Sequence, residues 1–420
     1  MIKGQSVRKM LLESRTAETF GERFRSMLIV EDEKGVESTA GASAAPEEFS
    51  VRELAESLVG SEWIADLARG DWESTKQLKA LGLREATGGL TPGNFSSINA
   101  FNLAVFGLFE AKVLASYKRP DFIADAVFTT RPTRTNGGKW VGVGAIGDVA
   151  KPVLPGEEFP SVGLPDNWLI IPENVKHGLK LALTREALVY DTTDTLYAEA
   201  SRCGAALGYR KEVRCADVAQ GLVNNYNRKG VPTNTYLTTG AYVNSITNTL
   251  VNPQSVDKAH QQLLAQTDPE TNLEIAIENG PLVLVPPALA FTAKSIAYTT
   301  TLEVLPGGGA SGTTRFFSSP GGVVIPFTIL SSQIWYNRLL TGGDGGAGAA
   351  VTPTNAVGRW LFGDLRQSFS YMEVWPLTVR NAEPSSMEMI SKDIVNAWAC
   401  SEYGVPVSVE PRSTIRNTVE

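Results

Sequence analysis

Two stretches of the sequence are rich in apolar residues and are predicted to form helices. In the second of them, Leu196, Ala200, Cys203 and Leu207 recur every three to four positions, the spacing of one helix face. The first spans Phe95 to Tyr117. The second begins at Asp191, where acids stand in the first turn, and continues to about Gly221, a residue type common just after a helix end. Both helices are predicted to be much longer than the average of about 11 residues.

Shorter stretches alternate apolar and polar residues with the period of a strand. The predicted strands are Ile123–Thr130, Lys139–Val143, Trp168–Ile171 and Val175–Leu183. In the last of them, Val175, His177, Leu179, Leu181 and Leu183 share one face. Residues 147–165 form an irregular segment rich in Pro and Gly, longer than a usual hairpin loop. We expect such a segment to contact a partner.

The second half of the chain has a different composition, with only 14 charged residues among residues 222–360. Thr, Asn and Gly are frequent there. Within it, residues 281–287 are predicted to form a buried strand and residues 287–297 a helix that starts at a proline. Further strands are predicted at Phe369–Val379 and Gly404–Val409.

The first fifty residues are instead highly charged, with 16 charged side chains. Amphipathic helical patterns at residues 6–27 and 51–59 flank a connector of small residues at 38–46. Too few apolar residues are present for this region to form its own core, so we expect an arm.

Composition and charge exclude several classes of protein. The 420 residues carry a net charge of −7, which argues against a dedicated nucleic-acid binder. No apolar run approaches the about 18 residues of a membrane span, and the N-terminus is not expected to be a secretory signal. Three cysteines without a Cys-x-x-Cys pair argue against a disulfide framework.

The motifs of common enzymes are incomplete. Gly142–Gly147 matches the dinucleotide pattern, but Pro152 and Pro155 prevent the helix that must follow it. Trp140 stands where a phosphate-binding loop needs Ser or Thr after Lys139. The two histidines are far apart, and Cys203 and Cys215 are too distant on one helix to share a metal. We expect no cofactor, no metal and no enzymatic activity.

The remaining architecture favours a structural protein that assembles with itself, because arms and long loops bury little surface in their own subunit. Ordering them costs about 1–2 kcal/mol per residue, which contacts with other copies would offset. The candidate intersubunit contacts are Lys139, Lys151, Glu157, Glu158, Arg202, Arg210 and Arg214. Glu157 and Glu158 form either a solvated acidic tip or an intersubunit ion pair. The three arginines contact either DNA or neighbouring carboxylates.

Several phrases of the sequence resemble the major capsid proteins of tailed phages with the Hong Kong 97-type fold, and the Mu-like major head subunits most closely. Lys176–Asp191 resembles their passage before the long spine helix, and Leu282–Ala293 their Leu-Val-Pro-Pro-Ala-Leu segment. Phe369–Val379 and Gly404–Arg412 resemble their closing strands. The resemblance covers residues 90–412 and depends on element order and short phrases.

This resemblance implies an α+β fold and a division of the chain into named parts. These are an N-terminal arm at 1–95, a helix leading into the P-domain at 96–122, the E-loop hairpin with flanking P-domain strands at 123–185 (tip near 147–167), the spine helix at 186–221, mainly the A-domain at 222–365, and closing P-domain strands at 366–420. It also implies a virion shell of pentamers and hexamers around packaged DNA, formed in the host cytoplasm with a portal and possible decoration or scaffolding proteins, and no membrane. The alternatives are an encapsulin-like shell that holds enzyme cargo and an acidic α/β enzyme of unknown chemistry.

Overall fold

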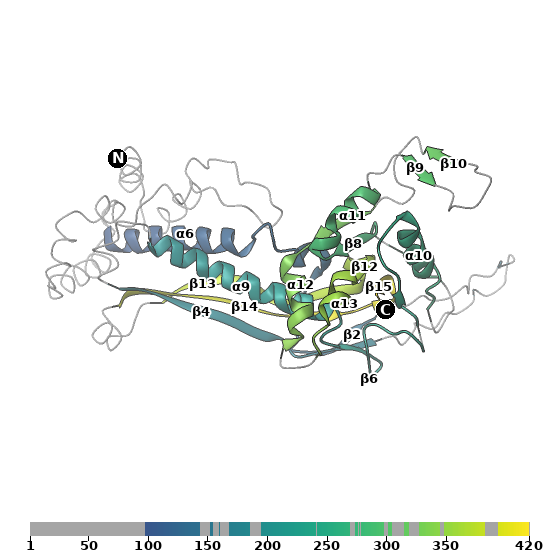
Figure 1. Cartoon of the computed structure of the whole chain (residues 1–420). Helices are drawn as coiled ribbons and strands as arrows, with labels where there is room; N and C mark the ends of the chain where they lie inside the picture. Colours follow the sequence, from purple (N-terminus) through teal and green to yellow (C-terminus); the bar gives the residue numbers. More distant parts are fainter. Residues whose placement is uncertain are drawn as a thin grey trace. The chain divides into compact units, whose positions relative to one another are not determined.

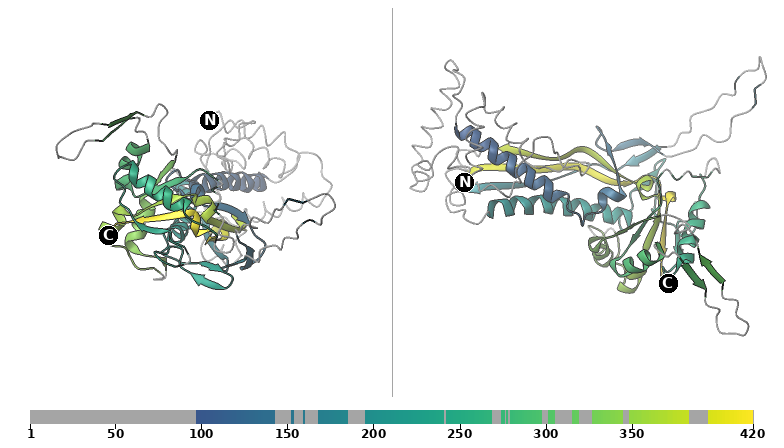
Figure 2. Two further views of the ribbon diagram at one scale, coloured as in Figure 1. Left: turned by 90° about the vertical axis from the view of Figure 1, so that its right-hand side faces the viewer. Right: turned by 90° about the horizontal axis from the view of Figure 1, so that it is seen from above.

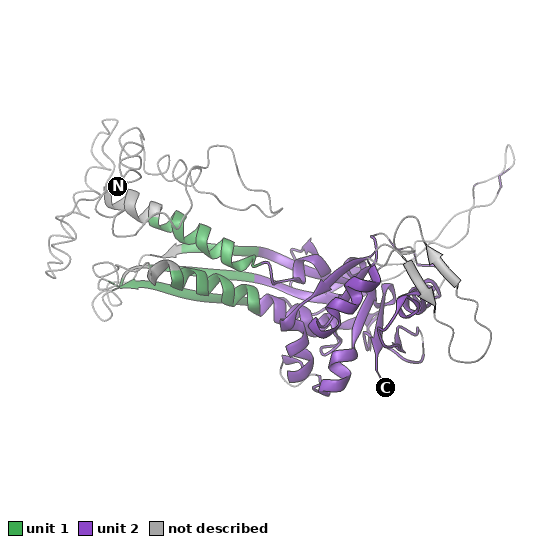
Figure 3. Cartoon of the chain, turned by 45° about the horizontal axis from the view of Figure 1, so that its top comes forward, with its two compact units in different colours: residues 1–119, 176–209, 376–402 green, residues 120–175, 210–375, 403–420 purple. Residues whose placement is uncertain are grey.

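The computed structural model divides the chain into two compact units, coloured in Figure 3. The structure describes residues 97–142, 152–153, 159, 168–184, 195–240, 242–268, 274–275, 277, 279–297, 301–304, 315–318, 327–344, 348–382 and 394–419. The predicted N-terminal arm and the tip near 147–167, apart from residues 152, 153 and 159, lie outside them. Figure 1 shows the order of the elements along the chain.

Unit 1 contains two helices and parts of three strands. The helices are α6 (Ser97–Tyr117) and the first part of α9 (Thr195–Ala219). The strands are β4 (Val175–Thr184), the end of β13 (Phe369–Ala382) and the start of β14 (Ile394–Ser408). In two further views, α6 and this part of α9 run alongside the strands (Figure 2).

Buried apolar residues hold α6 in unit 1. Val105, Leu108, Phe109 and Val113 of α6 are almost fully buried. The Phe109 ring stacks on the Trp398 ring of β14, with centroids 4.3 Å apart. Gly204 of α9 allows close approach, because a Cβ there would lie 2.3 Å from the Val113 carbonyl oxygen. The predicted helix at 95–117 is therefore confirmed.

Unit 2 is built around a five-stranded sheet in the order β11-β8-β12-β15-β7. The strands are β7 (Ser245–Thr247), β8 (Leu282–Val285), β11 (Thr328–Ser331), β12 (Trp360–Gly363) and β15 (Thr414–Thr418). β8 is parallel to β11 and antiparallel to β12. Helices α10 (Pro253–Leu264) and α11 (Pro287–Ala297) contribute Val256, Ala259 and Ala293 to the core that contains Phe362 of β12. The predicted buried strand and the helix starting at Pro287 are confirmed.

A second sheet of unit 2 has the order β2-β3-β5-β6, and all its pairs are antiparallel. Its strands are β2 (Gly138–Val141), β3 (Trp168–Ile171), β5 (Tyr226–Arg228) and β6 (Val231–Thr233). β2 and β3 bracket the segment predicted to carry the loop tip. The remaining sheets are β1-β13-β14-β4, where β1 is Thr129–Pro132, and the pair β9 (Thr301–Val304) with β10 (Arg315–Ser318).

Short helices complete the described part of unit 2. They are α7 (Ala124–Val127), α12 (Gln333–Thr341), α13 (Pro353–Gly358), α14 (Leu365–Ser368) and the 3-10 turn η3 (Pro411–Ser413).

The C-terminal end of α9 is fixed by a hydrogen-bonded cap. The Leu222 N–H donates to the Asp217 carbonyl at 2.8 Å, and the Gly221 N–H donates to the Val218 carbonyl at 3.1 Å. Gly221 has a φ of +70°, which glycine adopts without steric cost. This is a Schellman motif, so the predicted helix end at Gly221 is confirmed.

Three predictions about the strands need correction. Residues 123–130 do not form one strand, because a helical turn, α7, precedes β1. The predicted strand at 404–409 is not separate either, since β14 runs unbroken from Ile394 to Ser408. The face shared by Val175, Leu179 and Leu183 in β4 is buried only at Leu183, whereas Val175 and Leu179 are exposed.

Candidate functional site

The predicted contact residues are scattered in the structure. Lys139 lies exposed on β2, with its Nζ 4.2 Å from the centroid of the Trp168 ring on the neighbouring strand. Lys151, Glu157 and Glu158 lie outside the described residues. Lys139 is thus held by a cation–π contact within its own chain, with its remaining surface open to solvent.

The three arginines of α9 also have partners in their own chain. Arg202 in unit 1 is 74% exposed and pairs with Glu199, one helical turn earlier. In unit 2, Arg210 pairs with Asp344 at 2.5 Å, and Arg214 donates from Nη2 to the Gly404 carbonyl at 2.7 Å. Each of the three arginines therefore has a partner within its own chain, and Arg202 is the most exposed of them.

A buried acid on the same helix was missed by the sequence analysis. Glu212 is 1% exposed, and its carboxylate accepts hydrogen bonds from three donors. These are the N–H groups of Ile123 and Ala124, at 2.8 and 2.9 Å, and the Trp335 indole N–H at 2.5 Å. Burial raises the pKa of Glu212, while the three donors act in the opposite direction. Glu212 thus ties α9, α7 and α12 together.

A second network joins α9 to α12. The Arg338 guanidinium donates two hydrogen bonds of 2.8 Å to the Asp217 carboxylate, in a fork geometry that fixes both side chains. Asp344 extends the network, because its backbone N–H donates to Asp217 at 3.2 Å and its carboxylate pairs with Arg210. The Arg210 that the sequence indicated as a contact therefore belongs to an internal network.

A third network lies in the core of unit 2. Arg412 donates from Nε and Nη2 to the two Glu410 carboxylate oxygens, both at 2.6 Å, and both side chains are 2% exposed. Asp268 lies 3.6 Å from Arg412 and 3.7 Å from Arg228. Burial alone would lower the pKa of Arg412, but its hydrogen bonds and attraction to Glu410 outweigh this and raise it.

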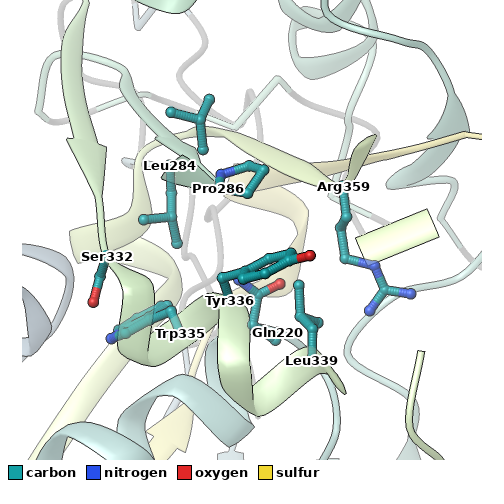
Figure 4. Close-up of a pocket in the computed structure, with 9 residues that line it drawn as sticks. Gln220, Leu284, Pro286, Ser332, Trp335, Tyr336, Leu339 and Arg359 are labelled. Carbon is teal, nitrogen blue, oxygen red and sulfur yellow. The ribbon is translucent and has the colours of Figure 1, made fainter. Parts of the chain in front are cut away.

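A small pocket opens where α9 ends (Figure 4). Its lining residues are Gln220, Leu284, Val285, Pro286, Ser332, Trp335, Tyr336, Leu339 and Arg359. Most of this lining is apolar, but it contains three buried polar atoms without a hydrogen-bond partner: Gln220 Oε1, Ser332 Oγ and Arg359 Nε. No spacing in the sequence could indicate this site, because its residues come from four separate segments.

Neither a metal site nor a membrane span is found in the part of the chain that the structure describes. No group of three or more His, Cys, Asp or Glu side chains there could hold a metal ion. Among the described helices, none is long and apolar enough to cross a bilayer. The charged clusters described above are structural networks that join helices to one another and to the sheets.

The buried ion pairs and hydrogen bonds of unit 2 fix the packing of its helices and sheets. Residues 170–417 match the phage capsid protein family. The match spans more than half of the chain, and the chain belongs to this family. The prediction of a phage major capsid protein, a structural protein of the virion shell, is confirmed, as is the α+β fold class.

The chain is similar to several solved structures, at low sequence identity. The capsid of the cyanophage P-SCSP1u has 14% sequence identity over 70% of this chain and 86% of that chain, with a TM-score of 0.40. A virus-like particle from Pyrococcus furiosus has 10% identity over 74% and 97%, with a TM-score of 0.39. The capsid of a native GTA particle has 12% identity over 72% and 91%, with a TM-score of 0.40. No curated protein matches the chain.

Proposed function

We propose that the chain assembles with copies of itself into pentamers and hexamers of an icosahedral shell that encloses packaged double-stranded DNA. The match of residues 170–417 to the phage capsid protein family is the observation that carries this proposal. Assembly would take place in the host cytoplasm, with a portal and with decoration or scaffolding proteins where they are used. The role is mechanical, and no cofactor or enzymatic step is part of it.

The sheet containing β2 supports contact with a neighbouring subunit. Among the strands of the described residues, β2 lies at the edge of its sheet, so that side of its backbone is a candidate for pairing with another chain. Val141 at the end of β2 is 79% exposed, although apolar. We propose that β2, with Lys139 and the following segment containing Lys151, Glu157 and Glu158, contacts an adjacent copy. Backbone pairing would set the register without a requirement for charge.

Contact with DNA is proposed to be weak and non-specific. A net charge of −7 repels the phosphate backbone, which allows the genome to move during packaging and release. Arg202 remains available for a contact that weakens as salt is added, because its side chain is largely exposed. Arg210 and Arg214 already have partners in their own chain. They could contact another subunit only through guanidinium nitrogens that these partners do not occupy.

Imaging of the purified protein by negative stain after size-exclusion chromatography tests the proposal. We expect closed shells or ring-shaped capsomers. DNA that purifies with the shells supports a phage capsid, whereas a purified enzyme cargo supports an encapsulin-like shell. A protein that stays monomeric under every assembly condition, also with portal and scaffold proteins from the same source, would contradict the proposed function.

Deletion of residues 1–45 tests the predicted arm. If the arm clamps neighbouring subunits, the truncated protein should form capsomers that fail to close, or shells that break at lower temperature. The measurement is thermal disruption of shells followed by light scattering, with the full chain as control. Truncated shells of normal yield and stability would show that the arm is not a clamp.

Replacement of both acids in the loop tests an intersubunit ion pair. We expect Glu157→Lys with Glu158→Lys to change assembly yield most at low salt, because ionic strength screens exposed charges over about 10 Å at 0.1 M. The measurement is assembly yield across a salt series, compared with Glu157→Gln and Glu158→Gln. If the wild type, the double Lys variant and the double Gln variant showed the same salt dependence, Glu157 and Glu158 would form a solvated acidic tip.

A further inference from the structure

The pocket at the end of α9 contains a positive charge that no acid balances among the described residues. Arg359 lines the pocket and makes no described ion pair, and its Nε has no hydrogen-bond partner. Burial lowers the pKa of the Arg359 side chain, which reports the cost of holding this charge away from water. By contrast, Arg338 and Arg412 each bind a carboxylate directly.

A second arginine increases this imbalance. Arg416 of β15 is half-buried, and burial and the charge of Arg359 both lower its pKa. Its Nε donates to the Ser245 hydroxyl at 3.1 Å, and its guanidinium lies 4.6 Å from the centroid of the Tyr236 ring. A Cβ at Gly221 would lie 3.6 Å from Arg416 Nη1, which places Arg416 at the same helix end as the pocket. A neutral hydroxyl and an aromatic ring offset only part of the free-energy cost of burying the Arg416 charge.

Two further side chains provide hydrogen-bonding groups to the pocket. Gln220, at the end of α9, and Ser332, before α12, are 5% and 6% exposed, and both carry an unpartnered oxygen. Figure 4 shows Ser332 on one side of the pocket and Arg359 on the opposite side, with Tyr336 and Gln220 between them. The Ser332 hydroxyl can donate to an anion, and the Gln220 amide can donate after a half-turn about its last bond.

We infer that this pocket recognises a carboxylate, and that in the shell an Asp or Glu side chain from an adjacent copy of the chain fills it. The inference rests on the proposed self-assembly. A carboxylate accepts from Arg359 and offsets one of the two positive charges of Arg359 and Arg416. An adjacent copy is a ready source, because the chain has 45 acidic residues against 38 basic ones. The apolar wall residues Leu284, Pro286 and Leu339 lower the local dielectric, which strengthens a charge-assisted hydrogen bond.

The subunit and the shell should respond in opposite directions to the loss of this charge. In the unassembled protein, Arg359→Gln removes a cation whose burial is not repaid by an acid. Its melting temperature should therefore stay the same or rise. In assembly, the same variant loses its acidic partner. We expect at least a tenfold increase in the protein concentration needed to form shells, which corresponds to about 1.4 kcal/mol.

Lys294→Gln is the matched control. It removes the same charge from an exposed position on α11 in the same unit. We expect it to leave both the melting temperature and the assembly concentration close to those of the wild type. A parallel loss in both variants would indicate a general effect of net charge and would overturn the inference.

Two direct measurements complete the test. A cryo-EM reconstruction of wild-type shells should show a carboxylate of an adjacent copy about 3 Å from Arg359 Nε. In the unassembled protein, acetate should raise the melting temperature of the wild type but not of Arg359→Gln. This second measurement does not depend on shell formation, so it separates failure of the pocket from failure of the proposed function.

Three results would overturn the inference. Water or inorganic phosphate at Arg359 in the reconstruction would show that no adjacent copy fills the pocket. A lower melting temperature of unassembled Arg359→Gln would show that the side chain acts within its own subunit. An unchanged assembly concentration in this variant would show that the shell does not use the site.

Discussion

Arg412→Met is expected to lower the free energy of unfolding by about 3–5 kcal/mol, because it leaves buried carboxylates without their partner. The Arg412 and Glu410 side chains are each 2% exposed and are joined by two hydrogen bonds of 2.6 Å. Asp268, 4% exposed, would lose its contact with the Arg412 guanidinium, 3.6 Å away. The measurement is urea unfolding of the purified, unassembled protein.

The double variant Glu410→Leu with Arg412→Met is the control for this prediction. It removes both members of the hydrogen-bonded pair, so it should be less destabilised than Arg412→Met alone. Lys294→Gln, an exposed change of the same charge, should remain within about 0.5 kcal/mol of the wild type. If Arg412→Met were as stable as Lys294→Gln, the buried network would not contribute to the stability of unit 2.

Local pattern was sufficient to predict the long helices and several strands. In α6 a run of apolar residues carries the signal, and in α9 apolar spacing and the glycine after the helix end carry it; both signals act within a few residues. β3 and α11 have apolar runs and a proline at positions that the structure uses. The family resemblance was likewise carried by short phrases, and it identified the class of protein because element order follows from these local signals.

The error at residues 123–130 has a cause distant in sequence. The segment is apolar enough for a buried strand or a buried helical turn, and periodicity does not separate the two. Glu212 decides between them, because its carboxylate accepts the N–H groups of Ile123 and Ala124 at the start of α7. A strand would instead place such N–H groups in a sheet ladder. An acceptor about 90 residues away leaves no mark on the local pattern.

The prediction of intersubunit contact residues was limited because the partners of a charged side chain can lie far away in the sequence. The sequence left open whether the arginines of α9 contact DNA or neighbouring carboxylates, and the groups that Arg210 and Arg214 bind are brought close only by the fold. Conversely, the inference about the pocket at Arg359 depends on the lack of an acidic partner for this side chain among the described residues. The lack of such a partner can be recognised only when the surrounding residues have been placed in space.

Glu212→Ala is expected to lower the free energy of unfolding by about 3–5 kcal/mol. Three donors would lose their acceptor: the N–H groups of Ile123 and Ala124 and the indole N–H of Trp335. An unsatisfied buried donor costs about 1–3 kcal/mol, and Trp335 is 2% exposed, so water does not replace the carboxylate readily. Urea unfolding of the unassembled protein measures the loss.

Glu212→Gln separates the hydrogen bonds from the charge. The glutamine keeps one oxygen acceptor and a similar volume, so it should retain part of the stability lost in Glu212→Ala. Since burial raises the pKa of Glu212, the wild type gains stability relative to Glu212→Gln as the pH falls through that pKa and the carboxylate becomes protonated. Equal stability of Glu212→Ala and the wild type would show that α7 and α12 are held in place without this carboxylate. A Glu212→Gln variant as unstable as Glu212→Ala would instead assign the effect to the negative charge.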